Sequence, residues 1–423
     1  MTIPTETDVL IVGGGPAGAL LGVLLARRGI NVLVAEKQTH LDRDFRGETL
    51  AAPSVVTLRK LGFGPAISEH GYLETSAVSM RMEGHEVFSV DYGRFSIGTL
   101  PIDIPQPALI GIFIDAARDL PGFTYAYSTS CTGLVEEDGV IRGAVLKQKD
   151  GSRVEVRARL VVGADGRFSK VRKEAGLDAR VQAMERDFLS FKLPRPADWG
   201  DSAQLVVDRD KHLVVLPTFP DFLRIGHNLP KRGLGELRKA GFDAFRDGIA
   251  AIDPRLKPLL DDHLHSWDDT GFLEIFTAEV DQWARDGLIL IGDASHTCTP
   301  ILGQGVNLAI QDTVCVAPVI ARALEKSGPG GSVAAGEFTE FVETRRKHKK
   351  RVTRFQRMQE VALAQRSPAK VLLRRLRFRA LDRLPVKYAV FGKVINAPHP
   401  IDPVDLHVPQ PKSPARPQPQ EAL

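Results

Sequence analysis

The sequence predicts an α/β fold, in which a parallel sheet carries glycine-rich turns, strand-rich segments are inserted, and helices follow. Short apolar runs at residues 8–12, 160–164 and 288–291 each lead into glycines and a helical pattern, which is typical of buried parallel strands. Residues 77–92 and 186–229 alternate between apolar and polar side chains or read as short strands, which indicates a second sheet. The C-terminal part has a helical pattern rich in arginine and lysine.

The first glycine-rich turn follows the strand at residues 8–12 and opens a helix. A second strand, at residues 31–35, ends in an acidic residue about twenty positions further on, as the dinucleotide-binding fingerprint of a Rossmann-like domain requires. The glycines allow a tight turn and a close approach of pyrophosphate, and the carboxylate accepts hydrogen bonds from a ribose diol. We expect the dinucleotide to be bound by Gly13, Gly15, Ala17, Gly18 and Glu36.

The two later strands end in pairs of glycine and aspartate. Asp165-Gly166 either contacts ribose or pyrophosphate or forms an ordinary strand-to-helix turn. Gly292-Asp293 ends the third strand, where the carboxylate suits a ribityl or ribose hydroxyl. Glycines then open another helix, where unpaired N–H groups and the helix dipole favour negative charge. Together these features describe a cradle for a flavin tail and its electron-rich ring.

Taken in order, the three motifs resemble the group A flavoprotein monooxygenases, the family of para-hydroxybenzoate hydroxylase, over roughly residues 5–325. That family has GxGxxG, then DG, then GD followed by H-x-x-x-P-x-x-G-Q-G-x-N. In this chain the last pattern is carried by His296, Pro300, Gly303, Gln304, Gly305 and Asn307.

The resemblance implies a GR2-type FAD-binding domain with an inserted substrate domain. It implies that NAD(P)H reduces FAD and that O2 then forms a C4a-hydroperoxide, which hydroxylates or epoxidises an electron-rich aromatic, quinone, quinolone or polyketide-like molecule. It places Arg46 on the FAD diphosphate or adenosine, and Gln106 and Pro300 beside the flavin ring. It also directs the backbone N–H groups of Val306 and Asn307 at the charge of the reduced ring.

The order of elements predicts a discontinuous domain organisation. Residues 1–75, 101–177 and 281–335 should form the FAD-binding domain. Residues 76–100 and 178–280 should build a mixed β-sheet that covers the reactive edge of the flavin, so that substrate binds between the two domains. Basic helices at 336–395 and a proline-rich segment at 396–423, expected to be disordered, should follow.

The basic helices admit two interpretations. Residues 345–351 are all basic, and the helix after Ser367-Pro368 sets Val371, Leu372, Leu376 and Leu384 against five arginines, among them Arg374. Such helices either lie on an anionic membrane, which would suit a lipophilic substrate, or pack one face on the flavin domain and leave their charges in water.

Composition narrows the class of protein. A net charge of +4 and sparse aromatic residues between the basic ones argue against nucleic-acid binding. The three cysteines form no CxxC pair, which favours a reducing cytoplasm, and Cys298 is expected to fill space rather than act as a nucleophile. We find no signal peptide, no metal-binding motif and no apolar run that approaches the length of a membrane span.

Three questions stay open at this point. The sequence contains no second dinucleotide fingerprint for the nicotinamide; Gly233-Leu234-Gly235 reads as a helix start. It names no catalytic base, since four histidines of the substrate region (His212, His227, His263 and His265) are more often structural or exposed. A flavin-dependent reductase of the geranylgeranyl-reductase type and a non-catalytic flavin-binding sensor are the alternatives to a monooxygenase, whereas a halogenase would need a WxWxIP segment that this chain lacks.

Overall fold

The computed structural model describes residues 3–41 and 48–395 of the 423-residue chain. Its largest sheet has eight strands, with the path β19-β20-β11-β1-β2-β8, and β10 and β9 extend it beside the first half of β11. The strands are β1 (Glu6–Val12), β2 (Val32–Ala35), β8 (Phe123–Ala126), β9 (Ser130–Glu137), β10 (Val140–Lys147), β11 (Arg153–Gly163), β19 (Ala284–Arg285) and β20 (Leu288–Leu290).

Five neighbouring strands of this sheet, from β20 through β11, β1 and β2 to β8, run parallel and end together. Val12 at the end of β1 pairs with Ala35 of β2 on one side and with Gly163 of β11 on the other, and Gly163 pairs with Leu290 of β20. The three segments with glycine and acidic residues therefore emerge at one edge of the sheet, the carboxyl edge at which α/β proteins bind ligands.

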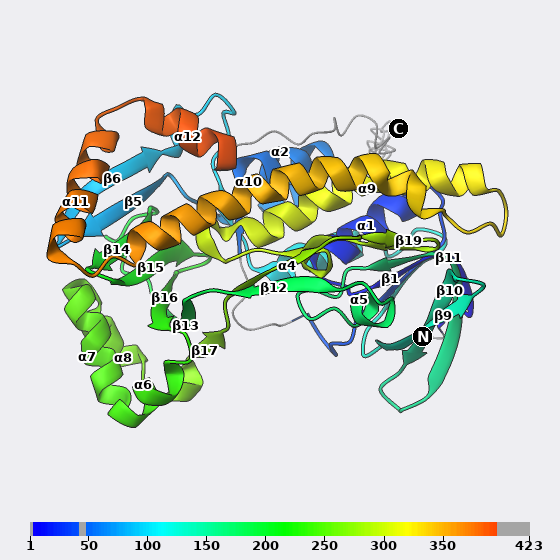
Figure 1. The fold of residues 1–423 in the computed structure, drawn as a ribbon, viewed down its shortest axis with the longest axis horizontal. Coiled ribbons are helices and arrows are strands. Elements are labelled where there is room, and N and C mark those ends of the chain that lie inside the picture. Colours follow the sequence, from blue (N-terminus) through cyan, green and yellow to red (C-terminus); the bar gives the residue numbers. More distant parts are fainter. Residues whose placement is uncertain (1–2, 42–47, 396–423) are drawn as a thin grey trace, which may run out of the picture.

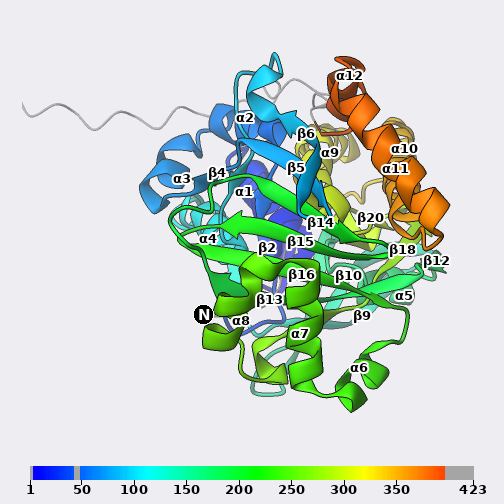
Figure 2. The same cartoon turned by 90° about the vertical axis from the view of Figure 1, so that its left-hand side faces the viewer.

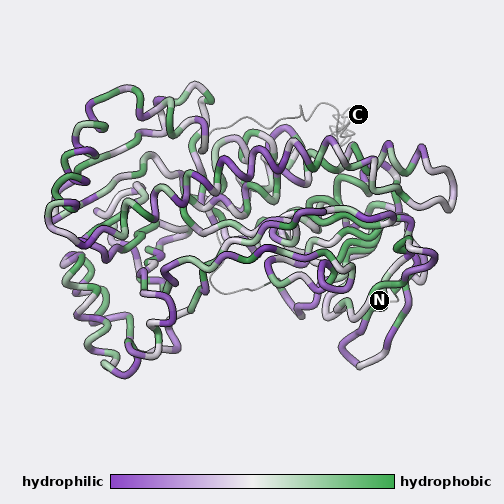
Figure 3. The backbone as a smooth tube through the Cα atoms, in the orientation of Figure 1, coloured by the Kyte–Doolittle hydropathy of each residue, from purple (hydrophilic) through white to green (hydrophobic). Residues whose placement is uncertain are grey.

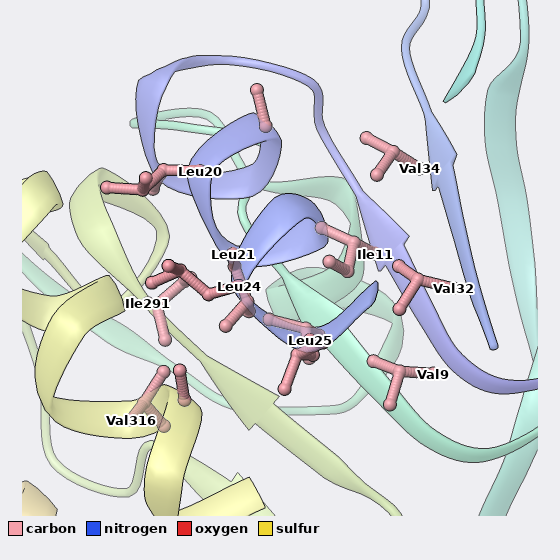
Figure 4. Packing of buried hydrophobic residues seen from close by; sticks show 14 of the residues in the cluster. Val9, Ile11, Leu20, Leu21, Leu24, Leu25, Val32, Val34, Ile291 and Val316 are labelled. Atoms are coloured by element: carbon pink, nitrogen blue, oxygen red, sulfur yellow. The ribbon is translucent and has the colours of Figure 1, made fainter. Parts of the chain in front are cut away.

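Helix α1 (Pro16–Ala26) lies between this sheet and α9 (Gln304–Ser327). All its residues except Pro16 are buried, which explains why it is apolar on every side. Figure 4 shows Leu20, Leu21, Leu24 and Leu25 of this helix among side chains of both neighbouring layers. Also in this part are α2 (Ala52–Lys60), α3 (Gly64–His70), α4 (Gln106–Asp115) and α5 (Lys170–Glu174).

The segment Ile301–Ser327, which includes α9, corrects one expectation. It has the length and composition of a membrane span, and it is the only such helix in the described part of the chain. However, 78% of its apolar window is buried inside the protein, where it packs against α1. This is the burial expected of a core helix.

A second sheet has seven strands in the order β17-β13-β16-β15-β14-β5-β6. Every neighbouring pair is antiparallel except β14 and β5, so the hairpin at residues 77–91 joins strands that lie more than a hundred residues later. The strands are β5 (Ala77–Met82), β6 (His85–Asp91), β13 (Arg186–Pro194), β14 (Ala203–Asp208), β15 (Lys211–Thr218), β16 (Phe222–Pro230) and β17 (Gly271–Leu273).

Helices α7 (Phe242–Ile252) and α8 (Lys257–His263) cover one face of the seven-stranded sheet, and α6 (Leu234–Ala240) packs against α7. Figure 2 shows α7 and α8 in front of β13 and β16, and buried apolar residues such as Phe191 and Phe245 fill the space between these layers. The Gly233-Leu234-Gly235 segment is the start of α6, as predicted, because Gly233 is the residue before its first turn.

Two three-stranded sheets connect the parts. One has the order β12 (Ala179–Ala183), β18 (Phe276–Val280) and β21 (His296–Thr297). The other has the order β3 (Thr49–Leu50), β7 (Ile102–Asp103) and β4 (Leu73–Glu74). The first sheet contains β21, which lies within the third motif, and the second contains β7, which lies shortly before Gln106. Both sheets therefore help to position the site.

The C-terminal helices are α10 (Thr339–Leu363), α11 (Pro368–Asp382) and α12 (Val386–Ile395). Helix α10 runs alongside α9 and reaches across to the seven-stranded sheet, where α11 packs on β6 (Figure 1). Figure 3 shows that apolar residues gather in the parallel strands, whereas α10 is largely hydrophilic. The segment 396–423 lies outside the described residues.

The structure shows that some of the basic residues in these helices are buried, whereas the contact with an anionic membrane stays a prediction. Arg345 and Lys349, one turn apart in the basic run, are buried and face α9, and neither meets water. In α11 the predicted solvated position of Arg374 is wrong, because this residue is only 5% exposed and donates to backbone carbonyls such as that of Arg209. Leu372 and Leu376 are instead 56% and 53% exposed.

Candidate active site

The first glycine turn is packed too tightly for side chains. Gly13 has φ of +104°, and a Cβ atom there would lie 2.5 Å from the carbonyl oxygen of Ala164. A Cβ on Gly18 would lie 1.9 Å from the carbonyl oxygen of Gly13. Gly15 is the residue before α1, and no side chain accepts hydrogen bonds from the N–H groups of the first turn of this helix. These N–H groups therefore face the edge of the sheet where the motifs meet.

Glu36 lies directly after β2 and is 3% exposed. Its Oε2 accepts a 2.7 Å hydrogen bond from the Gly14 N–H, and its Oε1 accepts one of 2.9 Å from the Gln38 N–H. A carboxylate has further acceptor sites, so this fixed geometry suits a ribose hydroxyl. Tyr125, which the sequence did not single out, donates from its hydroxyl to the Gly14 carbonyl at 2.8 Å and so holds the same turn from β8.

Of the two interpretations of Asp165, the structure supports the ordinary turn. The Asp165 Oδ2 accepts from the N–H groups of Lys170 at 2.6 Å and Val171 at 3.0 Å, which caps α5. Gly166 has φ of +84° and no neighbouring atom near the position of a Cβ. Contact of either residue with ribose or pyrophosphate stays a prediction.

The Gly292-Asp293 turn is held by a buried charge network that the sequence did not reveal. The Gly292 N–H donates to Asp312 Oδ2 at 2.8 Å, and Asp312 also binds Arg345 at 2.7 Å and Lys349 at 2.6 Å. Burial raises the pKa of Asp312, but the two cations outweigh burial and hold that pKa below its ordinary value. Helix α10 thus supplies the cations that fix a turn of the FAD-binding part.

The start of α9 is defined by a left-handed residue. Gly303 has φ of +61° and its N–H donates to the Pro300 carbonyl at 2.9 Å. Because α9 begins at Gln304, the N–H groups of Gly305 and Val306 have no carbonyl four residues earlier inside the helix, whereas the N–H of Asn307 can reach Gly303. The predicted contact of the Val306 and Asn307 N–H groups with the reduced ring stays a prediction.

Asn307 has a structural task at this helix start. Its Oδ1 accepts from the Ala51 N–H at 2.8 Å, and its Nδ2 donates to the carbonyls of Thr49 at 3.2 Å and Gly303 at 2.9 Å. It thereby ties β3 to the loop that precedes α9. Pro300 in that loop is exposed.

Three predicted contacts have different standing. Gln106 is the first residue of α4 and is buried, at 8% exposure. Asp293 is half-buried beside the end of β20. Arg46 lies outside the described residues, so its contact with the FAD diphosphate or adenosine stays a prediction.

A cluster of four charged residues lies where the seven-stranded sheet meets the β3–β7 strands. Glu48 Oε1 binds Arg224 at 2.8 Å and Lys192 at 3.2 Å. Asp103, which pairs with Thr49 across these strands, accepts from the Phe219 N–H at 3.0 Å. Burial and the charge of Glu48 raise the pKa of Asp103 to about 7. No sequence motif predicts this cluster, because its residues come from four separate segments of the chain.

The histidines and Cys298 do not form a nucleophilic site. Burial lowers the pKa of His212 to about 3 and that of His227 to about 4, so both rings are neutral, and His263 and His265 are exposed. Burial raises the pKa of the Cys298 thiol to about 12, which keeps it protonated. Among the described residues, no group of three or more His, Cys, Asp or Glu side chains could hold a metal ion.

The glycine turn at α1, the carboxylate after β2 and the open start of α9 fit FAD, and comparison with known proteins decides the family. The model of the FAD binding domain matches residues 6–218 and 260–356. The chain belongs to this FAD-binding family. It is 36% identical over 362 residues to 6-methylpretetramide 4-monooxygenase from Streptomyces rimosus, which covers 84% of each chain. The protein is thus an FAD-dependent monooxygenase, as predicted.

More distant relatives share the fold. P. aeruginosa PqsL, solved in complex with 2-aminobenzoylacetate, superposes with a TM-score of 0.75 at 21% identity and covers 89% of this chain and 99% of its own. Digeranylgeranylglycerophospholipid reductase from Methanosarcina acetivorans is 24% identical over 80% of each chain. The predicted α/β fold with an FAD-binding part, a second mixed sheet and C-terminal helices is confirmed.

Proposed function

We propose that the protein uses NAD(P)H and O2 to hydroxylate an electron-rich aromatic polyketide. The observation that carries this proposal is the meeting of the three motifs at one sheet edge in a chain that is 36% identical to a monooxygenase of 6-methylpretetramide. The relative named as a reductase is less similar, at 24% identity. The FAD-dependent reductase and the flavin-binding sensor are the alternatives that the experiment below separates.

The chain's own residues would hold and tune the cofactor. The N–H groups at the start of α1 would bind pyrophosphate, and Glu36 would accept hydrogen bonds from ribose. The N–H groups of Gly305 and Val306 would stabilise negative charge on the ring. Bound FAD supplies hydride acceptance and activation of O2, and the protein supplies orientation and exclusion of water.

The charged cluster would recognise the phenolic part of the substrate. It lies beside Thr49, which Asn307 ties to the start of α9, and it joins the two parts between which substrate is expected. Oε2 of Glu48 is buried and has no hydrogen-bond partner among the described residues. We propose that Asp103 accepts the proton of a substrate phenol, because a carboxyl with a pKa near 7 matches that task.

The first experiment mixes the FAD-loaded protein with NADPH or NADH without oxygen, then admits ¹⁸O2 with 6-methylpretetramide as the probe. We expect the flavin absorbance to bleach on reduction and to return with O2, and the product to gain one labelled oxygen atom. A phenol with a single ring, which lacks the fused ring system of the probe, serves as the control for substrate recognition.

Each other outcome selects an alternative. A product that gains two hydrogen atoms without consuming O2 would identify a reductase. Flavin that neither nucleotide reduces would contradict the NAD(P)H-dependent function and favour a sensor or a protein served by a separate reductase.

We further propose that α11 contacts an anionic membrane surface. Leu372, Leu373 and Leu376 of this helix are 46–56% exposed, and Lys370, Arg377 and Arg379 lie exposed on the same helix. Exposed leucines bordered by cations suit the interface of an anionic bilayer. Such contact would favour a lipophilic aromatic substrate.

A further inference from the structure

A groove of about 540 Å³ opens between α10 and the three-stranded sheet of β12, β18 and β21. We call it the basic groove. It is distinct from the glycine turn and from the charged cluster, because none of their residues lines it. Its polar lining includes Arg180, His296, Lys350, Thr353, Arg354 and Arg357.

The charges of the basic groove are not balanced by its acids. Arg180 pairs with Asp281 and lies 4.0 Å from Glu279, and Lys350 lies 3.5 Å from the same Glu279. Arg354 and Arg357, which project from α10 and are exposed, have no hydrogen-bond or ion-pair partner within the described part of the chain. The electrostatic neighbour of Arg357 on its own helix is Glu360. Two guanidinium groups are thus left to meet a ligand.

The floor of the groove belongs to the same loop as the flavin cradle. His296 lines the groove, is 6% exposed and has a buried Nδ1 without a hydrogen-bond partner in the described residues. Its Nε2 lies 3.3 Å from Thr353 Oγ1 on α10. Pro300 is four positions after His296 in the chain, so their Cα atoms lie at most about 14 Å apart.

Gln356 connects the two sites through hydrogen bonds. This residue of α10 is fully buried and accepts from the Thr299 N–H at 3.3 Å. It also donates to the carbonyls of Thr299 at 3.0 Å and Ile301 at 2.8 Å. Because Arg354 and Arg357 lie on the same turns of α10, their position relative to the flavin loop is set by these three bonds.

We propose that the basic groove binds the phosphate groups of NAD(P)H while the nicotinamide reaches the flavin. This inference rests on the proposed function, in which a nicotinamide nucleotide must dock although the sequence has a single dinucleotide fingerprint. Arginine binds phosphate through paired N–H donors, and the excess positive charge of the groove attracts a polyanion. A groove open to solvent also allows the oxidised nucleotide to leave.

The test measures equilibrium binding of NADP⁺ to the FAD-loaded protein by calorimetry, so that it does not depend on flavin reduction. The variant carries Arg354→Gln and Arg357→Gln together, which removes both charges and keeps good helix formers. The matched control is Arg351→Gln, an exposed arginine of the same helix that does not line the groove. We expect the Kd for NADP⁺ to rise roughly tenfold or more in the double variant only, with FAD content unchanged.

Competition identifies the source of the phosphate. The fragment 2′,5′-ADP should displace NADP⁺ from the parent protein, and inorganic phosphate at equal concentration should not. Equal displacement by inorganic phosphate would overturn the nucleotide assignment in favour of a general anion site. An unchanged Kd in the double variant, or no NADP⁺ binding by the parent, would overturn the inference as a whole.

Failure of the proposed function has a separate signature. If the parent protein binds NADP⁺ in the groove but NADPH does not reduce its flavin, the inference about the groove holds and the proposed reaction fails. If NADPH reduces the flavin equally well in the parent and the double variant at low nucleotide concentration, the NADPH-dependent half of the proposed reaction holds and the groove is not the docking site of the nucleotide.

Discussion

At the scale of single residues, the site depends on polar groups whose environment differs from water. Glu36 accepts hydrogen bonds from two backbone N–H groups, and Asp312 forms ion pairs with two cations. Asp103 is buried near the charge of Glu48, and both effects raise its pKa. The two cations hold the pKa of Asp312 below its ordinary value, which keeps this carboxylate charged. Asp103 alone is poised to exchange a proton near neutral pH.

Asp103→Asn tests that role because the amide keeps the acceptor for the Phe219 N–H but cannot take a proton. In the parent protein, turnover should rise with pH through about 7, since the acceptor must be deprotonated. In the variant we expect turnover to be about a hundredfold lower and to show no rise through pH 7. Steady-state rates between pH 5.5 and 8.5 measure both effects.

Asp119→Asn, at an exposed position, is the control and should leave turnover unchanged. FAD content should stay equal in all three proteins. If turnover of the Asp103 variant still rises with pH through about 7, another group accepts the proton.

At the scale of elements, α10 supports a turn of the FAD-binding part and also lines the basic groove, and its composition alone predicts neither function. One face places Arg345 and Lys349 against Asp312 and so anchors the Gly292-Asp293 turn. A second face borders the basic groove, and Gln356 connects both to the flavin loop. Helix α11 continues the basic sequence but exposes leucines, because it packs on β6 through residues such as Phe378 and Leu381.

Leu372→Ser combined with Leu376→Ser tests the membrane contact of α11. We expect binding to vesicles that contain phosphatidylglycerol to fall at least tenfold, because each leucine contributes about 1.5 to 3 kcal/mol when fully buried. Binding of the parent should weaken as salt is raised, since cations border the leucines. Vesicle co-sedimentation measures both.

Phe272→Ser removes an exposed apolar side chain from β17, far from α11 in the fold, and should not change vesicle binding. Equal binding by the leucine variant and the parent would contradict the proposed contact.

At the scale of the whole molecule, buried imidazoles connect stability to pH. Burial lowers the pKa of His212 to about 3, of His227 to about 4 and of His296 to about 3. The unfolded chain therefore binds more protons than the folded one below pH 6.5 or so. Asp103 works in the opposite direction, because its raised pKa makes the folded state bind an extra proton between about pH 4 and 7.

The free energy of unfolding should be nearly constant above pH 7 and fall as pH drops below about 6.5. Each imidazole contributes a slope of about 1.4 kcal/mol per pH unit down to its folded pKa. His227→Phe, which places a ring of similar size beside Phe245, should remove one such slope. Urea unfolding at several pH values between 5 and 8 measures it.

His263→Gln serves as the comparison at an exposed position and should keep the parent slope. An unchanged slope in His227→Phe would show that His227 is not protonated differently in the folded and unfolded states.

The sequence by itself determined the glycine turns, the apolar parallel strands and the acid after β2. These features depend on residues close together in the chain: a tight turn needs glycine, and a strand buried on both faces needs an uninterrupted apolar run. That is why the sequence alone identifies the family.

Only the tertiary structure decided which distant charges meet. Asp312 lies 33 residues from Arg345, and Glu48 more than 140 from Lys192. No local sequence pattern predicts such pairs. A run of basic residues has the same sequence pattern whether it faces water or a buried carboxylate. The physical reason is that burial changes the free energy of a charge far more than sequence context does, and the fold alone determines burial.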